Sequence, residues 1–260
     1  WVWPTGTLTR WPVHGEGLRR WPVEEGGGLR RLPLKPLFSD DKGKTFHFRG
    51  EVPPITDRGV DEMQIVERGD GSLWMLKRTA YGIGESFSYD GGHTWTEMQP
   101  SKIEHCVSRF YIGRLDSGNL LLVKHGAPDE MTGEGLKGRE RLMAWLSDDD
   151  GETWYGGLMI EERSCSYPDA TQGPDGTIYV IYDHERHGAK EILVAAFTEE
   201  DVAAGKPVSG EARFRQVVDK AFAPKPWAED KWEVRTQAEI DAGGGDRTGD
   251  APWRPARAAC

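Results

Sequence analysis

The stretch Ser147–Trp154, SDDDGETW, determines the organisation of this 260-residue chain because the same pattern occurs three times. The other copies are SDDKGKTF at Ser39–Phe46 and SYDGGHTW at Ser88–Trp95. We call each copy of this Ser-x-Asp-x-Gly-x-Thr-aromatic pattern a box. Its aspartate can accept backbone N–H bonds in a tight turn, and its glycine can take a positive φ. We therefore interpret the box as structural, with Asp90 and Asp150 as acceptors. A box that performs chemistry would need a nucleophile–base pair or a metal-ligand spacing, which it lacks.

The spacing of the boxes predicts the fold class. They begin at positions 39, 88 and 147, and the sequence between them reads as a strand, a turn and a second strand. The expected turn pairs are Asp70-Gly71, Ser117-Gly118 and Asp175-Gly176. Strand repeats of this period are typical of β-propeller blades. At about 50–60 residues per blade, the chain accommodates about four blades.

The composition fits a globular all-β protein and excludes several classes of partner. Tryptophan (11) and glycine (33) are abundant, as expected for short strands, tight turns and indoles packed between sheets. A net charge of -10 argues against nucleic acid, though not against a small anionic ligand. No apolar run is long enough to span a membrane. The three cysteines Cys106, Cys165 and Cys260 are predicted to be free thiols, not a disulfide scaffold.

The two ends of the chain differ from its centre. Residues 1–36 form a crude repeat that we interpret as a biased segment, the alternative being a degenerate pair of strands from an upstream unit. Residues 37–222 are assigned to propeller blades, and 223–260 to an extended or disordered tail. Because the chain starts at Trp1 without a signal peptide, we expect its natural start to lie upstream and its localisation to be unreadable. The segment Thr198–Lys206 predicts a short capped helix.

Functional residue types occupy matched positions in the three hairpins. Eight residues before and after the first residue of each turn lie charged, histidine or tyrosine side chains. Antiparallel pairing brings these positions together at the end of the hairpin away from the turn. Charged residues at strand ends are often only solvated, but three pairs in register favour one shared site. The pairs are Glu62 with Arg78, Arg109 with His125, and Tyr167 with Asp183.

These motifs resemble the sialidase (neuraminidase) family. The quoted segments are DEMQIVERGDGSLWMLKR, RERLMAWLSDDDGETW and SCSYPDATQGPDGTIYVIYDHE, and they cover about half of the chain. The resemblance implies an all-β, six-bladed β-propeller of sialidase type, of which this chain is an N-terminally incomplete member. No match exists to the family's F/Y-R-I-P strand, which supplies its first arginine, or to the aspartate that protonates the leaving group. Both belong to upstream blades.

The resemblance also implies roles for individual residues. Tyr167 would be the nucleophile and Glu62 the carboxylate that polarises it. Two arginines would bind the substrate carboxylate, and an acidic residue would steady an arginine. No cofactor or metal is implied, and we interpret the DHERHG segment from Asp183 to Gly188 as a solvated loop. The expected substrate-binding residues are Arg78, Arg139 (with Arg141 as the alternative), Arg109, Asp183 and His125.

The chemistry of an acidic sugar explains these residue types. A carboxylate on the anomeric carbon would repel a carboxylate nucleophile 4 Å away by about 4 kcal/mol at an effective dielectric constant of 20. A neutral tyrosine avoids this repulsion, but a phenol with a pKa of about 10 needs a base to take its proton. Arginine binds a carboxylate as a planar fork. Sialidases with a tyrosine nucleophile are known exceptions to the scheme of two catalytic carboxylates.

We therefore expect an exo-acting, retaining glycoside hydrolase that releases terminal sialic acid, or another 2-keto acid or uronic acid, from a sialylated or acidic glycan. The alternative is a non-catalytic propeller that binds glycans or proteins. By family resemblance the location would be secreted or periplasmic. The register further predicts that the Tyr167 hydroxyl and the Glu62 carboxylate lie within hydrogen-bond reach, about 2.6–3.2 Å. The boxes should lie far from both.

Overall fold

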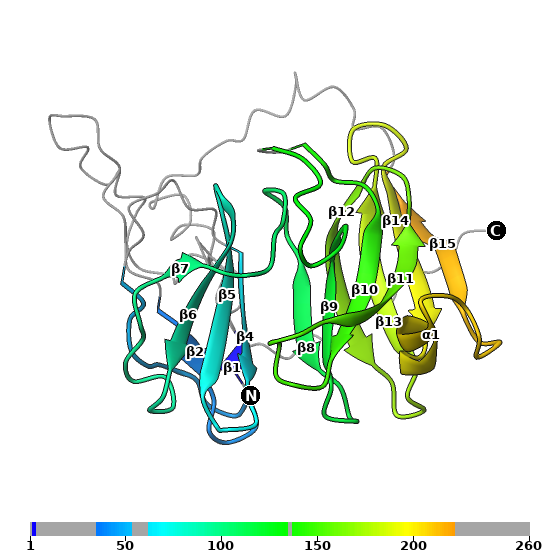
Figure 1. Ribbon diagram of the computed structural model, residues 1–260. Helices are drawn as coiled ribbons and strands as arrows, with labels where there is room; N and C mark the ends of the chain where they lie inside the picture. Colours follow the sequence, from blue (N-terminus) through cyan, green and yellow to red (C-terminus); the bar gives the residue numbers. More distant parts are fainter. Residues whose placement is uncertain (1, 4–34, 54–61, 135–136, 222–260) are drawn as a thin grey trace, which may run out of the picture. The chain divides into compact units, whose positions relative to one another are not determined.

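A computed structural model describes residues 2–3, 35–53, 62–134 and 137–221. This part of the chain is nearly all-β and forms four antiparallel sheets (Figure 1). The predictions for residues 1–36 and 223–260 lie outside the described residues, apart from 2–3 and 35–36. The expected all-β class is confirmed.

Each sheet is a meander in which consecutive strands are hydrogen-bonded in sequence order. One sheet has three strands and the other three have four each. The first sheet contains β1 (Val2–Trp3), β2 (Leu37–Phe38) and β3 (His47–Phe48). The second contains β4 (Met63–Glu67), β5 (Leu73–Thr79), β6 (Gly82–Ser88) and β7 (Gln99–Pro100). The third contains β8 (Tyr111–Arg114), β9 (Leu120–His125), β10 (Leu142–Ser147) and β11 (Tyr155–Glu161). The fourth contains β12 (Cys165–Gln172), β13 (Ile178–His184), β14 (Glu191–Phe197) and β15 (Arg213–Lys220).

The three predicted hairpin turns are confirmed. Gly71, Gly118 and Gly176 have φ values of 82°, 95° and 84°. A Cβ atom at any of the three would meet no heavy atom within 4 Å. The left-handed backbone conformation, and not lack of space, therefore selects glycine at these turns.

The box closes the turn between the last two strands of a sheet. In the third copy, Asp149 Oδ1 accepts a 2.9 Å hydrogen bond from the backbone N–H of Thr153, and Oδ2 accepts one of 2.6 Å from the Thr153 hydroxyl. Ser147 Oγ accepts a 2.8 Å bond from the backbone N–H of Gly151. Asp90 and Thr94 repeat this arrangement in the second copy, at 2.8 and 2.6 Å. The structural interpretation of the box is confirmed.

The prediction that Asp150 is the acceptor in the third box was wrong by one residue. Asp149, not Asp150, closes the turn, because the closing aspartate is the third residue of the pattern. Asp150 has a φ of 59°, and its side chain bonds elsewhere. Its Oδ2 accepts a 2.8 Å bond from the backbone N–H of Gly69, and its Oδ1 accepts one from Arg114. Asp150 therefore ties the third box to the first hairpin of the neighbouring sheet.

Apolar side chains on both faces of the third sheet explain its uninterrupted hydrophobic run. Along β9, Leu120 and Leu122 pack into the cluster shared with the second sheet. Leu121 and Val123 alternate with them and pack into the cluster shared with the fourth sheet. A strand covered on both faces is apolar at every position, because its side chains alternate between two cores.

The fourth sheet is covered on one face only, within the described residues. On β13, Ile178, Val180 and Tyr182 belong to the buried cluster shared with the third sheet. Tyr179 and Ile181 point to the opposite face and remain 42% and 44% exposed. An uncovered last face is what an incomplete propeller presents.

A short helix follows β14 as predicted. Helix α1 (Glu199–Ala204) begins after Thr198, whose side chain and that of Asp201 form a reciprocal capping box. Gly205 ends the helix with a φ of 64°. The expected capped helix is confirmed. Within the described ranges, no helix has the length and apolar character needed to cross a membrane.

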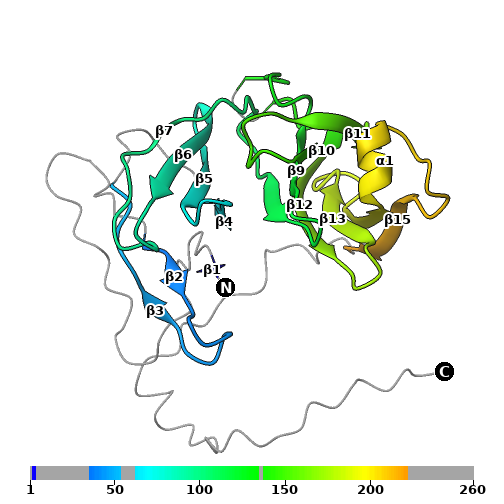
Figure 2. The same ribbon diagram turned by 60° about the horizontal axis from the view of Figure 1, so that its bottom comes forward.

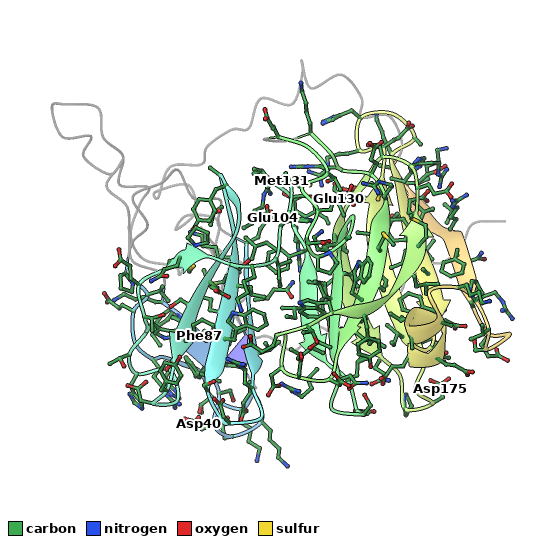
Figure 3. The ribbon with its side chains drawn as sticks, in the orientation of Figure 1. Asp40, Phe87, Glu104, Glu130, Met131 and Asp175 are labelled. Atoms are coloured by element: carbon green, nitrogen blue, oxygen red, sulfur yellow. The ribbon has the colours of Figure 1, made fainter. Side chains whose placement is uncertain are left out.

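The turns and the candidate site lie at opposite ends of the strands. The first strands of adjacent sheets are neighbours, since β8 contacts both β4 and β12. In Figure 2, β4 and β12 lie on the sides of their sheets that face each other. Asp40, in a box, and Asp175, in a hairpin turn, lie at one end of the sheets, whereas Glu104 and Glu130 lie at the other (Figure 3). In the second sheet, Ser88 at the start of the box pairs with Leu73 next to the hairpin turn, whereas Arg78 lies at the other end of β5, so this box is separated from the hairpin end as expected.

Candidate active site

One arginine connects two of the predicted residues. Arg78, near the end of β5, donates from Nη1 to Glu62 Oε2 at 2.8 Å and to the Tyr167 hydroxyl at 3.4 Å. The Arg78 side chain is only 5% exposed, whereas that of Glu62 is 26% exposed. Because one nitrogen contacts both oxygens, these cannot lie farther apart than the sum of the two distances. Glu62, Arg78 and Tyr167 therefore form one group from two different sheets.

The expected direct hydrogen bond between Tyr167 and Glu62 is not formed. Within the described residues, the Tyr167 hydroxyl donates to no carboxylate, and Arg78 Nη1 lies between the two groups. The physical reason is the ion pair: Glu62 is a carboxylate, and the buried guanidinium of Arg78 supplies its nearest donor.

The backbone at Tyr167 departs from the predicted register. In the β12–β13 pair, Ser166 and not Tyr167 lies opposite Asp183, and the register shifts by one residue before Asp169. Tyr167 and Pro168 form this β-bulge, and Tyr167 has a left-handed φ of 56°. A bulge adds one residue to a strand and re-aims its side chain. The predicted pairing was wrong because spacing from the turn counts residues but does not detect an inserted one.

Asp183 and Arg186 lie next to Tyr167. The Cζ atom of Arg186 lies 4.3 Å from the centroid of the Tyr167 ring. Arg186 Nε donates to Asp183 Oδ2 at 3.1 Å, and Nη2 donates to the same oxygen. Ser166 Oγ donates to Asp183 Oδ1 at 2.7 Å. Asp183 first, and Tyr167 as well, raise the pKa of the Arg186 guanidinium above its ordinary value.

The interpretation of Asp183–Gly188 as a solvated loop holds for residues 185–188, which form an exposed turn, but it was wrong for the first two residues. Asp183 and His184 belong to β13, and the His184 side chain is buried beside Glu191, with Nδ1 3.1 Å from its carboxylate. Arg186 is 47% exposed, yet its guanidinium is fixed by Asp183.

The structure separates Arg139 from its alternative Arg141. Arg139 Nη2 donates to the carbonyl of Val107 at 3.0 Å, and its Nε is buried with no partner among the described residues. Arg141 instead pairs with Glu130 and has a left-handed φ of 54°. The charge of Arg139 acts on His105, as does that of Arg78. The positive charges of Arg139 and Arg78 thus both help to lower the pKa of His105.

His125 lies in the interior against a second histidine. Its ring centroid is 5.6 Å from that of His105, and both side chains are fully buried. His125 Nδ1 lies 3.1 Å from the carbonyl oxygen of Glu140, which can only accept, so Nδ1 carries the proton. Burial lowers the pKa of His125 to about 4, and burial with neighbouring positive charge holds the pKa of His105 well below its ordinary value. Both imidazoles are neutral near pH 7, and a ligand could reach His125 only if its neighbours moved.

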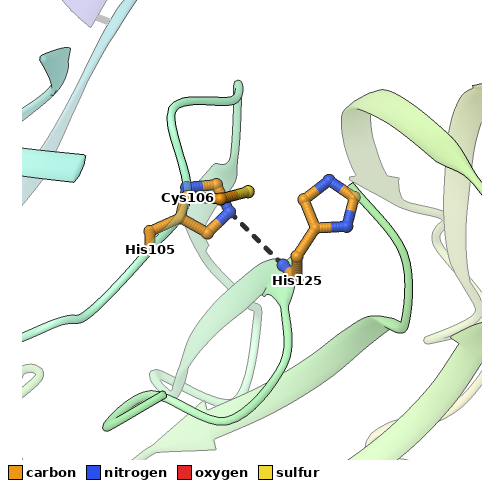
Figure 4. A group of neighbouring side chains, drawn as sticks. All are labelled: His105, Cys106 and His125. Atoms are coloured by element: carbon orange, nitrogen blue, oxygen red, sulfur yellow. Dashed lines mark hydrogen bonds between the residues drawn. The ribbon is translucent and has the colours of Figure 1, made fainter. Parts of the chain in front are cut away.

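His105, Cys106 and His125 are the best candidates for metal ligands among the described residues. One ligand atom from each lies within 4.8 Å of the others (Figure 4). However, His105 Nε2 already accepts a 3.3 Å hydrogen bond from the backbone N–H of His125. Lys124 and Arg139 add positive charge next to both rings. A divalent cation would have to displace that hydrogen bond, and the neighbouring positive charges would repel it. These three side chains therefore fit a metal poorly.

The remaining predicted residue, Arg109, forms a separate ion pair. Its Nη2 donates to Asp169 Oδ2 at 2.6 Å, and its side chain is 32% exposed. Asp169 is on β12, directly after the bulge that carries Tyr167. The thiols of Cys106 and Cys165 are free and buried, as expected, and Cys260 lies outside the described residues.

The sequence did not predict two residues that lie next to the expected site residues, Arg186 and His105. Arg186 follows Asp183 by three positions, and a charged residue so close to a predicted site residue was the available signal. His105 comes from the segment between β7 and β8, which has no repeat register that could have located it.

Comparison with known proteins identifies the family. The BNR repeat-like domain family matches residues 12–180. A sialidase of Micromonospora viridifaciens is 27% identical over 200 residues, covering 68% of this chain and 29% of that protein. An anhydrosialidase of Macrobdella decora is 26% identical over 200 residues, covering 68% of this chain and 26% of that protein. The chain thus spans less than a third of the length of these relatives.

A solved structure supports the fold. The leech intramolecular trans-sialidase, determined with 2,7-anhydro-Neu5Ac, superposes with a TM-score of 0.52 and 22% sequence identity. The match covers 65% of this chain and 28% of that one. At this identity the likeness shows the propeller fold alone. Together with the three boxes, the family match shows that this chain belongs to the BNR repeat-like domain family, as an Asp-box protein of the sialidase type.

Proposed function

We propose that this chain carries the nucleophile side of the active site of an exo-acting, retaining glycoside hydrolase that releases a terminal sialic acid or a related acidic sugar. The observation that supports this most directly is the contact of Arg78 Nη1 with both Glu62 and Tyr167. It joins a base, a phenol and a carboxylate-binding cation, the three groups that the reaction needs on this face of the sugar.

In the first step, the Tyr167 oxygen attacks the anomeric carbon while its proton passes to Glu62. A bond forms between the phenol oxygen and that carbon, and the bond to the leaving oxygen breaks with its electron pair. The leaving oxygen takes a proton from an acid for which this sequence offers no matching aspartate. Water then attacks the covalent intermediate and gives a proton to the deprotonated acid, while the bond to the phenol oxygen breaks and Glu62 returns its proton to that oxygen. Two inversions give net retention.

The substrate carboxylate would change the role of Arg78. In the structure, Arg78 Nη1 contacts both Glu62 and Tyr167. A carboxylate bound by the guanidinium draws Nη1 toward itself, so that Glu62 can approach the Tyr167 hydroxyl. Binding of the correct anion would thereby prepare the base. Catalytic hydrogen bonds that form only in the complex are common.

Arg78 and Arg139 are the proposed carboxylate ligands. In each, Nε is buried and has no partner among the described residues, so both guanidiniums retain bonding capacity. A hydrogen bond to a charged group contributes roughly 1.5–3 kcal/mol. Arg109 and His125 are proposed to shape the wall of the site, Arg109 through Asp169 and His125 through its contact with His105.

The test is release of a fluorescent aglycone from an α-sialoside, by this chain and by a longer chain that adds upstream blades. We expect turnover by the longer chain that is lost in Tyr167→Phe and retained in Tyr89→Phe, which removes the hydroxyl of a box tyrosine that is 72% exposed. Proton NMR of the first product should show the same anomeric configuration as the substrate. Binding of sialosides without turnover by the longer chain would contradict the enzyme and identify a glycan-binding propeller.

A further inference from the structure

Arg186 contacts the face of the proposed nucleophile. Its Cζ atom lies 4.3 Å from the centroid of the Tyr167 ring, a distance at which a cation is attracted to the ring's negative face. The Tyr167 hydroxyl accepts a 3.4 Å hydrogen bond from Arg78. Within the described residues, one arginine therefore holds the ring and another holds the oxygen.

Arg186 is itself held in place. Its Nε and Nη2 both donate to Asp183 Oδ2, and Asp183 Oδ1 accepts a 2.7 Å bond from Ser166. The Asp183 side chain is 14% exposed. A guanidinium fixed through two N–H groups on a mostly buried carboxylate has little freedom to leave the ring.

Tyr167 needs such support because its backbone is strained. It has a φ of 56° and lies in the bulge of β12. A side chain in this conformation persists only where surrounding contacts determine it, and such strain is common at functional sites. The contacts run from Ser166 to Asp183 and from Asp183 to Arg186, which lies against the Tyr167 ring. Tyr167 is thus supported from the side of the neighbouring strand.

We propose that Arg186 is a positioning residue that fixes the orientation of the Tyr167 ring, with Asp183 and Ser166 as its anchors. This inference rests on the proposed function, in which Tyr167 is the nucleophile. Attack on the anomeric carbon requires the phenol oxygen to be aligned with the breaking bond. A displacement of about 1 Å can reduce the rate about 100-fold.

The kinetic test compares Arg186→Ala with a matched control. Arg49→Ala is that control, because Arg49 also pairs with an aspartate, Asp40, and lies 4.7 Å from the ring centroid of Phe38, in a different sheet. In the longer chain, we expect Arg186→Ala to lower kcat by roughly 10- to 100-fold. The KM for the sialoside and the Kd for free N-acetylneuraminic acid should change less than about threefold, and Arg49→Ala should change none of these. Arg186→Lys, which keeps a cation above the ring, should recover part of kcat.

A second measurement does not depend on turnover. The seven tyrosines are replaced by 3-fluorotyrosine, and the ¹⁹F resonance of Tyr167 is assigned by its loss in Tyr167→Phe. Arg186→Ala and Asp183→Asn should both shift and broaden this resonance, whereas Arg49→Ala should leave it unchanged. This readout reports the ring directly and separates positioning from a general loss of stability.

The outcomes distinguish the two proposals. An unmoved Tyr167 resonance in Arg186→Ala would overturn the positioning role even in an active enzyme. A Kd for N-acetylneuraminic acid that weakens as much as kcat/KM falls would show that Arg186 binds the sugar instead. If the wild-type longer chain has no turnover, the proposed function fails, and the ¹⁹F shift still decides whether Arg186 holds Tyr167.

Discussion

The hydroxyl of Tyr167 accepts a 3.4 Å hydrogen bond from Nη1 of Arg78, a residue 89 positions earlier in the chain. The two residues come from different sheets, so their contact depends on how the sheets pack and not on any local motif. It places a permanent positive charge next to the phenol oxygen. This contact, and the ion pair with Glu62, lead to the first prediction.

Replacing Arg78 should selectively impair the use of acidic substrates. We expect Arg78→Ala to lower kcat/KM for a sialoside by the equivalent of roughly 2–4 kcal/mol, because a charged hydrogen bond to the carboxylate is lost. Arg78→Lys should recover only part of this loss, since an ammonium cannot present a planar fork. Steady-state kinetics of the longer chain measure both, with Arg68→Ala as a control outside the site. An equal penalty on a substrate analogue without the carboxylate would contradict the clamp.

The two adjacent aspartates of the third box should stabilise the fold through independent contacts. Asp149→Ala removes the bonds to Thr153, and Asp150→Ala removes those to Gly69 and Arg114. We expect each to reduce the free energy of unfolding by roughly 1–3 kcal/mol. In double-mutant cycles measured by urea unfolding, Arg114→Ala should couple to Asp150→Ala and be additive with Asp149→Ala. Coupling to Asp149 instead would show that the assignment of the two carboxylates is reversed.

The acid stability of the third box should depend on Thr153. The hydroxyl and the backbone N–H of Thr153 lower the pKa of Asp149 to about 2. Because this folded value is below the unfolded value of about 3.9, the contribution to stability is present above pH 4 and is lost as the pH falls toward 2. Thr153→Val should therefore be less stable than wild type at pH 7, and the difference should shrink between pH 4 and pH 2. A difference in unfolding free energy that is independent of pH would contradict this.

His125 should remain neutral in mildly acidic solution. Burial lowers its folded pKa to about 4, below the unfolded value of about 6.5, so the unfolded chain binds the proton more readily in this window. Stability should therefore fall as the pH drops from about 6.5 to 4, and His125→Gln should reduce that slope while exposed His187→Gln should not. NMR titration of the imidazole resonances checks the cause directly. A His125 resonance that titrates near pH 6.5 in the folded protein would refute the buried, neutral state.

Local sequence alone determined the parts of this fold that close over a few residues. The box joins Asp149 to Thr153 four positions away, and the hairpin turns need glycine at a positive φ. The spacing of Glu62 and Arg78 around their turn likewise predicts their contact, because β4 and β5 pair without interruption. In each case the interacting groups are brought together by the backbone geometry of one turn or one hairpin, so their order in the sequence is sufficient.

Tertiary structure determined the contacts that do not recur from one repeat to the next. The bulge at Tyr167 shifts the register by one residue and sets Ser166 opposite Asp183, which residue counting could not detect. Asp150 faces Gly69 of another sheet, Arg186 returns to the ring of Tyr167, and Arg78 separates Glu62 from the phenol. Such contacts join segments whose separation in sequence carries no periodic signal, and they form only where packed sheets and a strained backbone bring charge and ring together. The box pattern therefore predicts where each blade turns, whereas the packing of the blades determines which side chains meet at the site.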